Sequence, residues 1–565
     1  MIKKILLIFL VACFSLSISA QTTNEGTPMS WDIVDEKSSL IAITMPEVNM
    51  GVIKKQDEIN DNVRSKPFRI GIYQEVNYGL TNDGEWTELK NGDRIWRIGF
   101  SSKGALNLSV NFDKFFLPEG AHIYLYNNDK SDLLGAYTKT NNNADKALGS
   151  WFVKGDKLWV EYYEPKEVKG EGELHLGAVI HGYRLGEDYQ NGYFKDENQK
   201  IDESGDCNQD VDCPIGADFE SQRDVLKKSV AFFRMGNGFV CTGSLINNTD
   251  QDNTPYFLTA DHCFTNPSGV DSDPALYSMR FNWISPTPDC ATTAGSANGP
   301  TNFVMNGSTL RAKNPGSDVM LVEINNDIPT TWDVTYAGWD RSDSTPSFQV
   351  GIHHPSGDIM KICRDDNSAT KVTQFGVQTW DINGLTNSGN SGNATGWELG
   401  VTEGGSSGSA LYDQNGRIIG QLLGGLAACT GTNDNNAHDY YGRFAISWDA
   451  GGTAATQLKD WLDPADTNPM TLDTKDNTLS INDEFLEANI TIFPNPTSGV
   501  IKVRTSGLVG DLSYEVFNLL GQVLKSDVLQ NETIQLNNLS NNIYFIKITE
   551  VDTDKSLVKK IVLNR

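Results

Sequence analysis

Three short segments contain the residue types that acyl-transfer chemistry needs. The segment YFLTADHC (256–263) is an apolar strand pattern that ends in an acid, His262 and a cysteine. The segment SDVMLV (317–322) places Asp318 before an apolar run, and GVTEGGSSGSAL (400–411) places Ser407 in a glycine-rich turn. Such a turn can present a hydroxyl while backbone N–H groups point at one spot. A histidine base, an aspartate that orients its imidazole and a serine nucleophile together predict hydrolysis through an acyl-enzyme.

Each segment alone is weak evidence, because glycine-serine turns, single histidines and aspartates before strands are common structural features. Their order along the chain, His262, Asp318, Ser407, is the order found in chymotrypsin-type double β-barrel proteases. With HHPSGD (353–358) and HDYYGRF (438–444), the motifs TADHC, SDVMLV and GSSGS closely resemble the bacterial lysyl endopeptidases of the trypsin-like class. The resemblance covers about 201–465, which is less than half of the chain.

The resemblance implies a role for each matched residue. His262 would be the general base, Asp318 its orienting partner and Ser407 the nucleophile. The backbone N–H groups of Gly405 and Ser407 would form the oxyanion hole, where loss of one donor typically costs about 3–4 kcal/mol. The resemblance also implies three disulfides and leaves Cys363 free; the implied pairs are Cys207–Cys429, Cys213–Cys290 and Cys241–Cys263.

Substrate preference depends on Asp439, which the resemblance places at the base of the substrate pocket. A buried carboxylate there would pair with the ammonium of a substrate lysine and disfavour the longer, planar arginine. One position departs from the family, because Leu423 stands where the family has a histidine beside the pocket. Trp380 is our expectation for the aromatic partner of that site. Cleavage after lysine is therefore predicted, and a broader Lys/Arg preference stays open.

The remaining histidines give no metal or cofactor prediction. His353 and His354 belong to the HHPSGD turn, so we interpret them as structural. His438 precedes Asp439 and would either tune the pocket or lie in an exposed loop. The chain has no CxxC pair and no HExxH motif, so we predict no metal site and no organic cofactor. His122, His175 and His181 form no cluster in the sequence.

Length and composition indicate how many elements must hold these residues in place. A chain of 565 residues is long enough for three or four domains, and its net charge of −27 makes nucleic acid an unlikely partner. Short alternating segments separated by Gly, Asn and Asp predict an all-β protein. We expect a chymotrypsin-like double β-barrel protease domain, flanked by a β-sandwich-like pro-region and a small C-terminal β-sandwich. The expected divisions are 1–20 signal peptide, 21–200 pro-region, 201–465 protease, 466–488 linker and 489–565 C-terminal domain.

The first twenty residues, MIKKILLIFLVACFSLSISA, are typical of a signal peptide. Cleavage after Ala20 is expected, while LVAC (10–13) also resembles a lipoprotein box in which Cys13 would be acylated. No later segment is long and apolar enough to span a membrane. Seven cysteines remain after removal of the signal peptide, all of them in the protease segment. Export to an oxidising compartment favours disulfides, and the odd number leaves at least one thiol over.

The two flanking regions carry their own signals. Lys200 stands in the acidic, turn-rich stretch NQKIDESGDC (198–207), where cleavage after lysine would fit self-processing. From about 489, the opening FPNPTSG, a central GQ and a terminal Lys-Lys strand resemble the C-terminal sorting domain of type IX secretion. An ordinary carbohydrate-binding-like sandwich is the alternative. Expected partners are protein or peptide substrates and the type IX secretion machinery.

The protease segment is poor in basic residues. Residues 201–465 contain 14 Lys+Arg against 32 Asp+Glu, so most basic residues lie in the regions that would be discarded. An enzyme that cuts at basic residues gains persistence by carrying few of them, and its negative field would attract basic substrates. The acidity of many extracellular proteins would produce the same bias. The runner-up class is a non-catalytic, protease-like binding or adhesion module.

Overall fold

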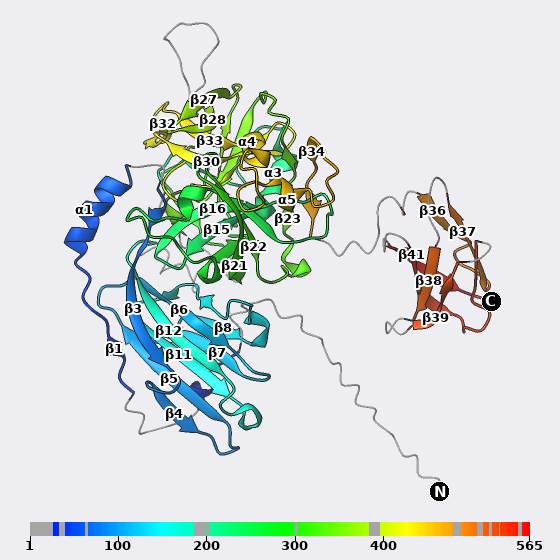
Figure 1. Cartoon of the computed structure of the whole chain (residues 1–565), viewed down its shortest axis with the longest axis horizontal. Coiled ribbons are helices and arrows are strands. Elements are labelled where there is room, and N and C mark those ends of the chain that lie inside the picture. Colours follow the sequence, from blue (N-terminus) through cyan, green and yellow to red (C-terminus); the bar gives the residue numbers. More distant parts are fainter. Residues whose placement is uncertain are drawn as a thin grey trace. The chain divides into compact units, whose positions relative to one another are not determined.

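β-Strands are the predominant regular structure of the protein, as the alternation of apolar and polar residues predicts. In strand β41 (Asn542–Glu550) every second residue is buried, whereas strand β15 (Val230–Met235) is buried at every position because both of its faces are covered. The computed structural model (Figure 1) describes residues 26–32, 40–62, 66–185, 200–201, 204–299, 303–382, 396–477, 486, 489–505, 512–518, 523–529, 532–551 and 556–565. Cys13 and Ala20, the residues of the lipidation and signal-cleavage hypotheses, lie outside the described residues.

The chain divides into two compact units, Met1–Asn477 and Thr478–Arg565. The expected linker was to begin at residue 466, but the strands β34 (Thr471–Leu472) and β35 (Lys475–Asp476) pair with strands of the first unit. Their backbone hydrogen bonds add this stretch to the protease segment, so the first unit extends to Asn477. The polar composition of 466–477 did not reveal the pairing, because edge strands this short carry no periodic pattern.

Two sheets form the N-terminal part of the first unit (blue to cyan in Figure 1) and enclose a core that includes Trp96, Phe112 and Tyr162. One sheet has the order β1-β5-β11-β7-β8 with β4 on β5, and the other has the order β10-β6-β12-β3 with β9 on β6. The strands and helices of this part are β1 (Ile43–Thr44), β3 (Gly71–Gly79), β4 (Glu85–Glu88), β5 (Arg94–Ser101), β6 (Asn107–Phe116), β7 (His122–Asn127), β8 (Leu133–Tyr137), β9 (Leu148–Gly149), β10 (Val153–Lys154), β11 (Lys157–Glu164), β12 (Glu173–Gly182), α1 (Met50–Asn60), η1 (Met29–Trp31), η2 (Lys139–Asn141) and η3 (Lys166–Val168).

Two larger sheets form the protease segment (green to orange in Figure 1), and each has its own buried cluster. The first has the order β20-β18-β15-β16-β17-β22-β21, with β2 of the N-terminal part on β16. Its strands are β2 (Phe68–Arg69), β15, β16 (Phe239–Leu245), β17 (Tyr256–Thr259), β18 (Ser278–Phe281), β20 (Val304–Asn306), β21 (Ser308–Asn314) and β22 (Val319–Ile324).

The second large sheet has the order β14-β26-β25-β29-β30-β33-β28-β27, with β24 and β34 attached through β30. Its strands are β14 (Gln209–Asp210), β24 (Trp339–Asp340), β25 (Gln349–His353), β26 (Lys361–Asp365), β27 (Thr370–Gln374), β28 (Val377–Ile382), β29 (Ala410–Asp413), β30 (Ile418–Gly425), β33 (Asp439–Arg443) and β34.

Short strand pairs and helices complete the first unit. The pairs are β13 (Lys200–Ile201) with β19 (Ser296–Ala297), β23 (Thr335–Tyr336) with β35, and β31 (Cys429–Thr430) with β32 (Asn433–Asp434). The helices are α3 (Glu220–Leu226), α4 (Phe444–Asp449), α5 (Lys459–Leu462), η4 (Lys227–Ser229), η5 (Asp261–Cys263), η6 (Pro274–Leu276), η7 (Thr330–Trp332) and η8 (Pro355–Gly357).

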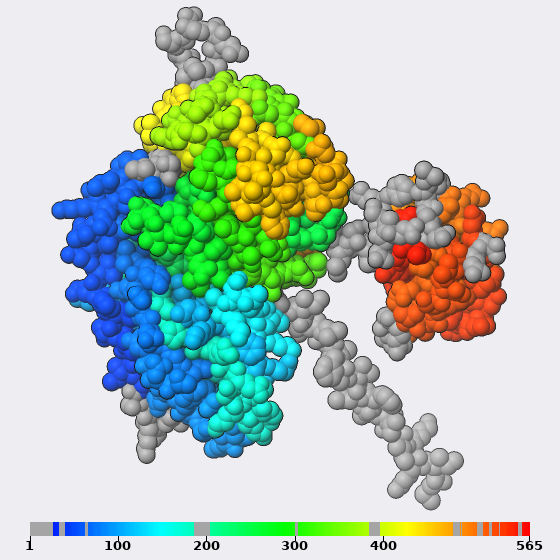
Figure 2. Space-filling view, viewed as in Figure 1, coloured from blue at the N-terminus to red at the C-terminus, as the bar shows by residue number. Residues whose placement is uncertain are grey.

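The N-terminal part packs directly against the protease segment, as the contact between the blue-cyan and green surfaces in Figure 2 shows. Phe232, Val240 and Trp283 of the protease segment belong to the N-terminal core. Polar contacts also cross the boundary, since the buried Arg234 donates hydrogen bonds to the Ser150 carbonyl (2.8 Å) and to Ser109 Oγ (2.7 Å). A shared core of this kind joins the two parts more firmly than a surface contact would.

The second unit has a core of its own, which includes Val503, Val516 and Ile546. It contains a three-stranded sheet, β36-β37-β40, and a four-stranded sheet, β39-β38-β41-β42. The strands are β36 (Ile490–Phe493), β37 (Val500–Thr505), β38 (Leu512–Phe517), β39 (Val523–Val528), β40 (Thr533–Gln535), β41 and β42 (Ser556–Leu563). Among the residues described, no helix has the length and apolarity to cross a membrane.

Candidate active site

His262 and Asp318 lie together because strands β17 and β22 are neighbours in an antiparallel sheet. Thr259, the last residue of β17, pairs with Met320 near the start of β22, so the turn after β17 meets the residue before β22. The Asp318 carboxylate accepts hydrogen bonds from the His262 backbone N–H (2.9 Å) and from the ring Nδ1 (2.9 Å). Two contacts from one carboxylate fix both the position and the rotation of the imidazole.

The Asp318 contact also determines which ring nitrogen of His262 is basic. A carboxylate accepts the Nδ1 proton, which leaves Nε2 with the lone pair that a general base uses. Nε2 is buried and has no hydrogen-bond partner among the described residues. Asp318 itself is 3% exposed and has a φ of 53°, a left-handed conformation that aspartate tolerates better than most residues. The Gln421 side chain donates to the carbonyl groups of Ser317 and Asp318 and so holds this turn.

Ser407 lies in a turn whose shape depends on glycine. Gly405 and Gly408 have φ values of 97° and 81°, and a Cβ on Gly408 would lie 2.0 Å from Thr259 Oγ1. The turn is attached to β16, because the Thr242 N–H donates to the Ser407 carbonyl (2.8 Å) and the Thr242 hydroxyl donates to the Gly405 carbonyl (2.9 Å). The serine loop is therefore held against β16, the neighbour of the strand that leads into the histidine turn.

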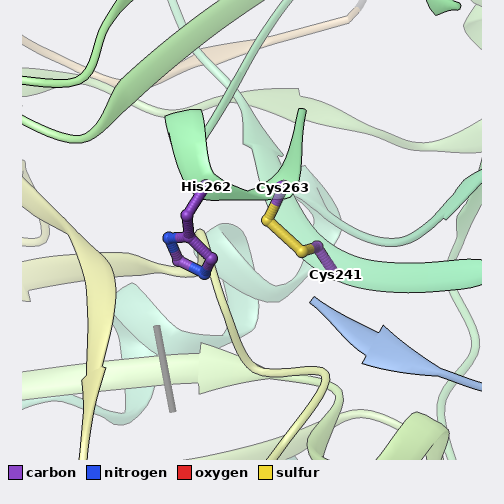
Figure 3. Close-up of side chains that lie close together, drawn as sticks. All are labelled: Cys241, His262 and Cys263. Atoms are coloured by element: carbon purple, nitrogen blue, oxygen red, sulfur yellow. A yellow bond between two sulfur atoms is a disulfide. The ribbon is translucent and has the colours of Figure 1, made fainter. Parts of the chain in front are cut away.

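A disulfide links the histidine turn with β16, the strand that holds the serine loop. Cys241 of β16 and Cys263, the residue after His262, are bonded, and Cys263 Sγ lies 3.8 Å from the Ser407 carbonyl oxygen. Figure 3 shows His262 beside this disulfide. Cys241, His262 and Cys263 are close enough to form a metal-ligand group, but the disulfide occupies both sulfur atoms, so we assign no metal to the group.

The backbone N–H groups of Gly405 and Ser407 donate no hydrogen bond to any residue that the structure describes. Around them the loop is hydrogen-bonded internally, since Ser406 N–H donates to the Glu403 carbonyl and Ser409 N–H donates to the Ser406 carbonyl. Gly405 has no room for a side chain, because a Cβ there would lie 2.9 Å from the His354 carbonyl oxygen. Backbone donors fixed in this way can stabilise a negative oxygen that forms beside Ser407.

Asp439 lies at the start of β33 and is 1% exposed. Its Oδ2 accepts hydrogen bonds from the Trp397 indole N–H (2.8 Å) and the Thr402 hydroxyl (2.7 Å). Gly425 leaves space for it, since a Cβ on Gly425 would lie 2.1 Å from Asp439 Oδ1. The carboxylate is thus buried and oriented, as a group that recognises a substrate cation must be.

The expectation that Trp380 is the aromatic partner near Leu423 stays a prediction. Trp380 pairs with Tyr441 across strands β28 and β33, and its indole N–H donates to the Ile419 carbonyl. Asp439 pairs with Ile382, two residues further along β28, and Trp397 donates a hydrogen bond directly to Asp439. Trp397 and Thr402 were not among the residues predicted from the sequence. The sequence feature that could have identified them is their position immediately upstream of the serine loop, because that region lies close to the same site. Leu423, the position that departs from the family, is buried within β30.

The other cysteines follow the pairing that the resemblance implies. Cys207 is bonded to Cys429, and Cys213 to Cys290. Cys363 is a free, buried thiol whose pKa is raised by burial and then by the nearby Asp439 charge. A thiol in such surroundings is a poor nucleophile. Lys200 lies in β13, where its backbone pairs with Ala297.

His353 and His354 are fully buried, and burial lowers the pKa of each to about 3. The Nδ1 atom of His353 lies 2.8 Å from Ser406 Oγ, and Nδ1 of His354 donates to the Asp358 carbonyl (2.9 Å). Both rings are therefore neutral supports beneath the serine loop. His438 contacts Asp381 through Nδ1 (3.0 Å), which directs its ring away from the neighbouring Asp439.

The three histidines of the N-terminal part contact that part itself. His122 stacks on Tyr163, and burial lowers its pKa. His175 is hydrogen-bonded to Asp113 and Asn77, and His181 lies 2.8 Å from Ser102 Oγ. These contacts give each imidazole a structural role.

Comparison with known proteins identifies two parts of the chain. Residues 201–442 match the family described as "Lysyl endopeptidase, C-terminal domain", so the first unit contains a protease domain of the lysyl endopeptidase family. Residues 491–564 match the "Secretion system C-terminal sorting domain". The protein is accordingly a secreted or cell-surface protein that carries a type IX sorting domain.

A curated lysyl endopeptidase of Pseudomonas aeruginosa is 25% identical over 374 residues, which cover 64% of this chain and 75% of that protein. Among solved structures, PorZ, described as a surface component of the type-IX secretion system of Porphyromonas gingivalis, is 9% identical with a TM-score of 0.12. That match covers 57% of this chain and 32% of PorZ, so the chain spans about a third of PorZ. A "Biofilm associated protein - BSP domain" gives 9% identity and a TM-score of 0.12 over 94% of this chain and 85% of that one. At these TM-scores neither structure defines the fold.

Proposed function

We propose that this protein is a secreted serine endopeptidase that hydrolyses peptide bonds on the carboxyl side of lysine. Its chemistry would use Ser407 as nucleophile, His262 as general base and Asp318 as the group that orients the imidazole. The observation that carries the proposal is the Asp318 carboxylate, which holds both the backbone N–H and the Nδ1 of His262. Such a double contact serves a base that must keep one tautomer and one orientation.

The proposed reaction has two halves. Ser407 Oγ attacks the substrate carbonyl carbon while its proton passes to His262 Nε2, and the oxyanion accepts hydrogen bonds from the N–H groups of Gly405 and Ser407. The C–N bond then breaks, the leaving nitrogen takes the proton from His262, and an acyl-enzyme remains. A water molecule next gives its proton to His262 and attacks the ester, and the proton returns to Ser407 Oγ as the acid product leaves. No metal or organic cofactor takes part in this scheme.

Preference for lysine is assigned to Asp439. A substrate ammonium would form a buried ion pair with this carboxylate, whose orientation is fixed by Trp397 and Thr402. The family match and the 25% identical relative support lysine specificity. Leu423, at the position of the family's histidine, is the reason to keep a broader Lys/Arg preference as the alternative.

The remaining parts of the chain would fold, guard and export the protease. We assign the two N-terminal sheets to a sandwich-like pro-region, the two larger sheets to a double β-barrel and the C-terminal unit to a β-sandwich recognised by the type IX machinery. Cleavage after Lys200 would release the pro-region. Because Lys200 and Ile201 pair with Ala297 and Ser296, this strand must leave β19 before a protease can bind it.

A mixed peptide library separates the candidate functions. The proposed enzyme cleaves after lysine, and a serine-directed covalent inhibitor abolishes the cleavage. Cleavage after both lysine and arginine, or after another residue, would indicate a protease of the same fold with a different pocket. A folded chain that neither cleaves nor reacts with the inhibitor would indicate a non-catalytic binding module and contradict the proposal.

A further inference from the structure

A short strand of the N-terminal part lies beside the candidate active site. Strand β2 pairs antiparallel with β16, with Arg69 opposite Phe239 and Phe68 opposite Val240. The next residue of β16 is Cys241, which is bonded to Cys263 next to His262. Figure 3 shows a blue strand of the N-terminal part beside Cys241. The N-terminal part thus adds a strand to the sheet at its catalytic edge.

The register of this pairing points two particular residues toward the level of the nucleophile. The pairing itself ends at Phe68 and Val240; carried on, the same register would set Pro67 opposite Cys241 and Lys66 opposite Thr242. Thr242 is the residue whose N–H donates to the Ser407 carbonyl. Pro67 is buried and Lys66 is half-buried, which is consistent with a chain segment that enters a cleft.

Phe68 anchors the segment on the serine loop. Its ring covers Gly404, where an added Cβ would lie 2.6 Å from the ring atom Cδ2. The Arg184 guanidinium lies 4.5 Å from the centre of the same ring. Arg184 also forms an ion pair with Asp61 (2.6 Å). A cavity of about 470 Å³ adjoins this contact, and its lining includes Phe68, Arg184 and Gly404.

The buried Asp57 carboxylate holds Arg69, the last residue of β2. Asp57, on α1, is 2% exposed and accepts hydrogen bonds from Arg69 Nη2 (2.6 Å) and Nε (2.9 Å) and from the Tyr183 hydroxyl (2.7 Å). Arg184 Nη1 donates to the Arg69 carbonyl (3.2 Å). The strand is therefore fixed to the body of the N-terminal part before it meets the protease segment, which lowers the entropic cost of binding.

We propose that Lys66 and Pro67 form a built-in substrate that the enzyme binds but does not cleave. This inference rests on the proposed function and identifies how the pro-region blocks the cleft. Lys66, which forms no ion pair with the residues that the structure describes, would turn into the Asp439 pocket, and Pro67 would follow the bond that Ser407 attacks. Hydrolysis would break the bond from the Lys66 carbonyl carbon to the Pro67 nitrogen after that nitrogen takes a proton from His262. The proline ring replaces the N–H with a ring carbon and fixes φ, so the leaving nitrogen is crowded and rigid.

Proline also prepares the residue before it for binding. A residue that precedes proline is restricted to extended conformations, which are those that pair with a sheet edge. Tethering adds a further effect, since a segment held in the same chain acts at an effective concentration on the order of millimolar. Even modest affinity for the cleft would then suppress activity until the pro-region leaves.

The test uses the full chain with Lys200→Gln, which removes the proposed processing bond and keeps the pro-region attached. To this background we add Pro67→Ala, or Pro165→Ala as a matched proline control in the N-terminal part. Intact mass and N-terminal sequencing report cleavage, and a chromogenic lysyl peptide reports activity. We expect the background and the control to stay whole at residue 66 and nearly inactive. Pro67→Ala should cut after Lys66 and gain activity by about 100-fold.

A second pair of variants keeps the inference testable if Pro67→Ala fails to fold. In the same background, Lys66→Gln should raise the labelling rate of Ser407 by a fluorophosphonate at least about tenfold. Lys54→Gln, an exposed lysine change on α1, should leave that rate unchanged. Unchanged labelling in Lys66→Gln, or a folded Pro67→Ala chain that stays whole and inactive, overturns the inference. If the released wild-type protease itself neither labels nor cleaves, the proposed function fails, and the inference fails with it.

Discussion

The Trp397 indole N–H donates a hydrogen bond to Asp439 Oδ2 at 2.8 Å, and the Thr402 hydroxyl donates to the same oxygen at 2.7 Å. These donors come from the segment immediately before the serine loop, so Asp439, the proposed specificity residue, and Ser407, the proposed nucleophile, share one support. The arrangement predicts that changes to the support alter substrate binding more than the chemical step.

Trp397→Phe removes the indole donor and keeps an aromatic ring. Hydrogen bonds to charged groups contribute about 1.5–3 kcal/mol, so KM for a lysyl peptide should rise roughly tenfold to 100-fold while kcat changes little. Trp380→Phe is the matched control, because the Trp380 indole donates to the Ile419 carbonyl rather than to Asp439. If the two changes raise KM equally, the assignment of Trp397 to the substrate pocket is wrong.

Asp439→Asn keeps the shape of the side chain and removes its charge. Since the charge would be the partner of the substrate ammonium, kcat/KM for lysyl peptides should fall by about 100-fold or more. Asp434→Asn, in the nearby hairpin β31–β32, should change kcat/KM by less than about twofold. Retained lysine cleavage in folded Asp439→Asn would contradict the assignment.

Loss of the Cys241–Cys263 disulfide should weaken stability and activity together. The bond closes a loop with a sequence separation of 22, for which the unfolded-chain model gives about 3 kcal/mol. The double variant Cys241→Ala/Cys263→Ala should lose about that much free energy of unfolding in a urea titration. Its kcat should also fall, because the bond joins the His262 turn to the strand that holds Ser407. Full kcat in this variant would show that the disulfide does not position the site.

Acid should destabilise the protein partly through His354. Its folded-state pKa of about 3 lies below the ordinary value of 6.5 because the ring is buried, so the unfolded chain binds more protons between these values. The free energy of unfolding then falls as the pH drops below about 6.5, by up to about 1.4 kcal/mol per unit for this group. His354→Phe cannot take up the proton, and its stability should fall less steeply between about pH 6.5 and pH 4.5. Parallel pH profiles for the two proteins would contradict this explanation.

Removal of residues 488–565 should block export. The sorting domain has its own hydrophobic core and forms a separate unit, so its deletion leaves the first unit intact. We expect the truncated protein to accumulate in the periplasm, measured by immunoblots of cell fractions and medium. Normal secretion of the truncated protein would refute the role of this domain.

Local sequence patterns predicted the parts of the site that lie on regular elements. The apolar run before His262 and the run after Asp318 form neighbouring strands, and the glycines around Ser407 form the expected turn. These residues could be predicted because strand burial and glycine conformations leave direct marks in a sequence.

Long-range contacts between irregular segments produce no comparable pattern in the sequence. Trp397 contacts Asp439 across 42 positions, and no periodicity links the two residues. Strand β2 is too short to show alternation, and its position beside β16 depends on the Asp57–Arg69 ion pair and the shared core. The strands β34 and β35 escaped prediction for the same reason.

The most direct test of the central claim is digestion of a mixed peptide library by the processed protease, with products identified by mass spectrometry. We predict cleavage on the carboxyl side of lysine, lost by about a million-fold in Ser407→Ala and retained in Ser409→Ala, a change to a buried serine in the same loop. Lysine-directed cleavage that persists in Ser407→Ala, or its absence in the folded wild-type protease, would contradict the claim.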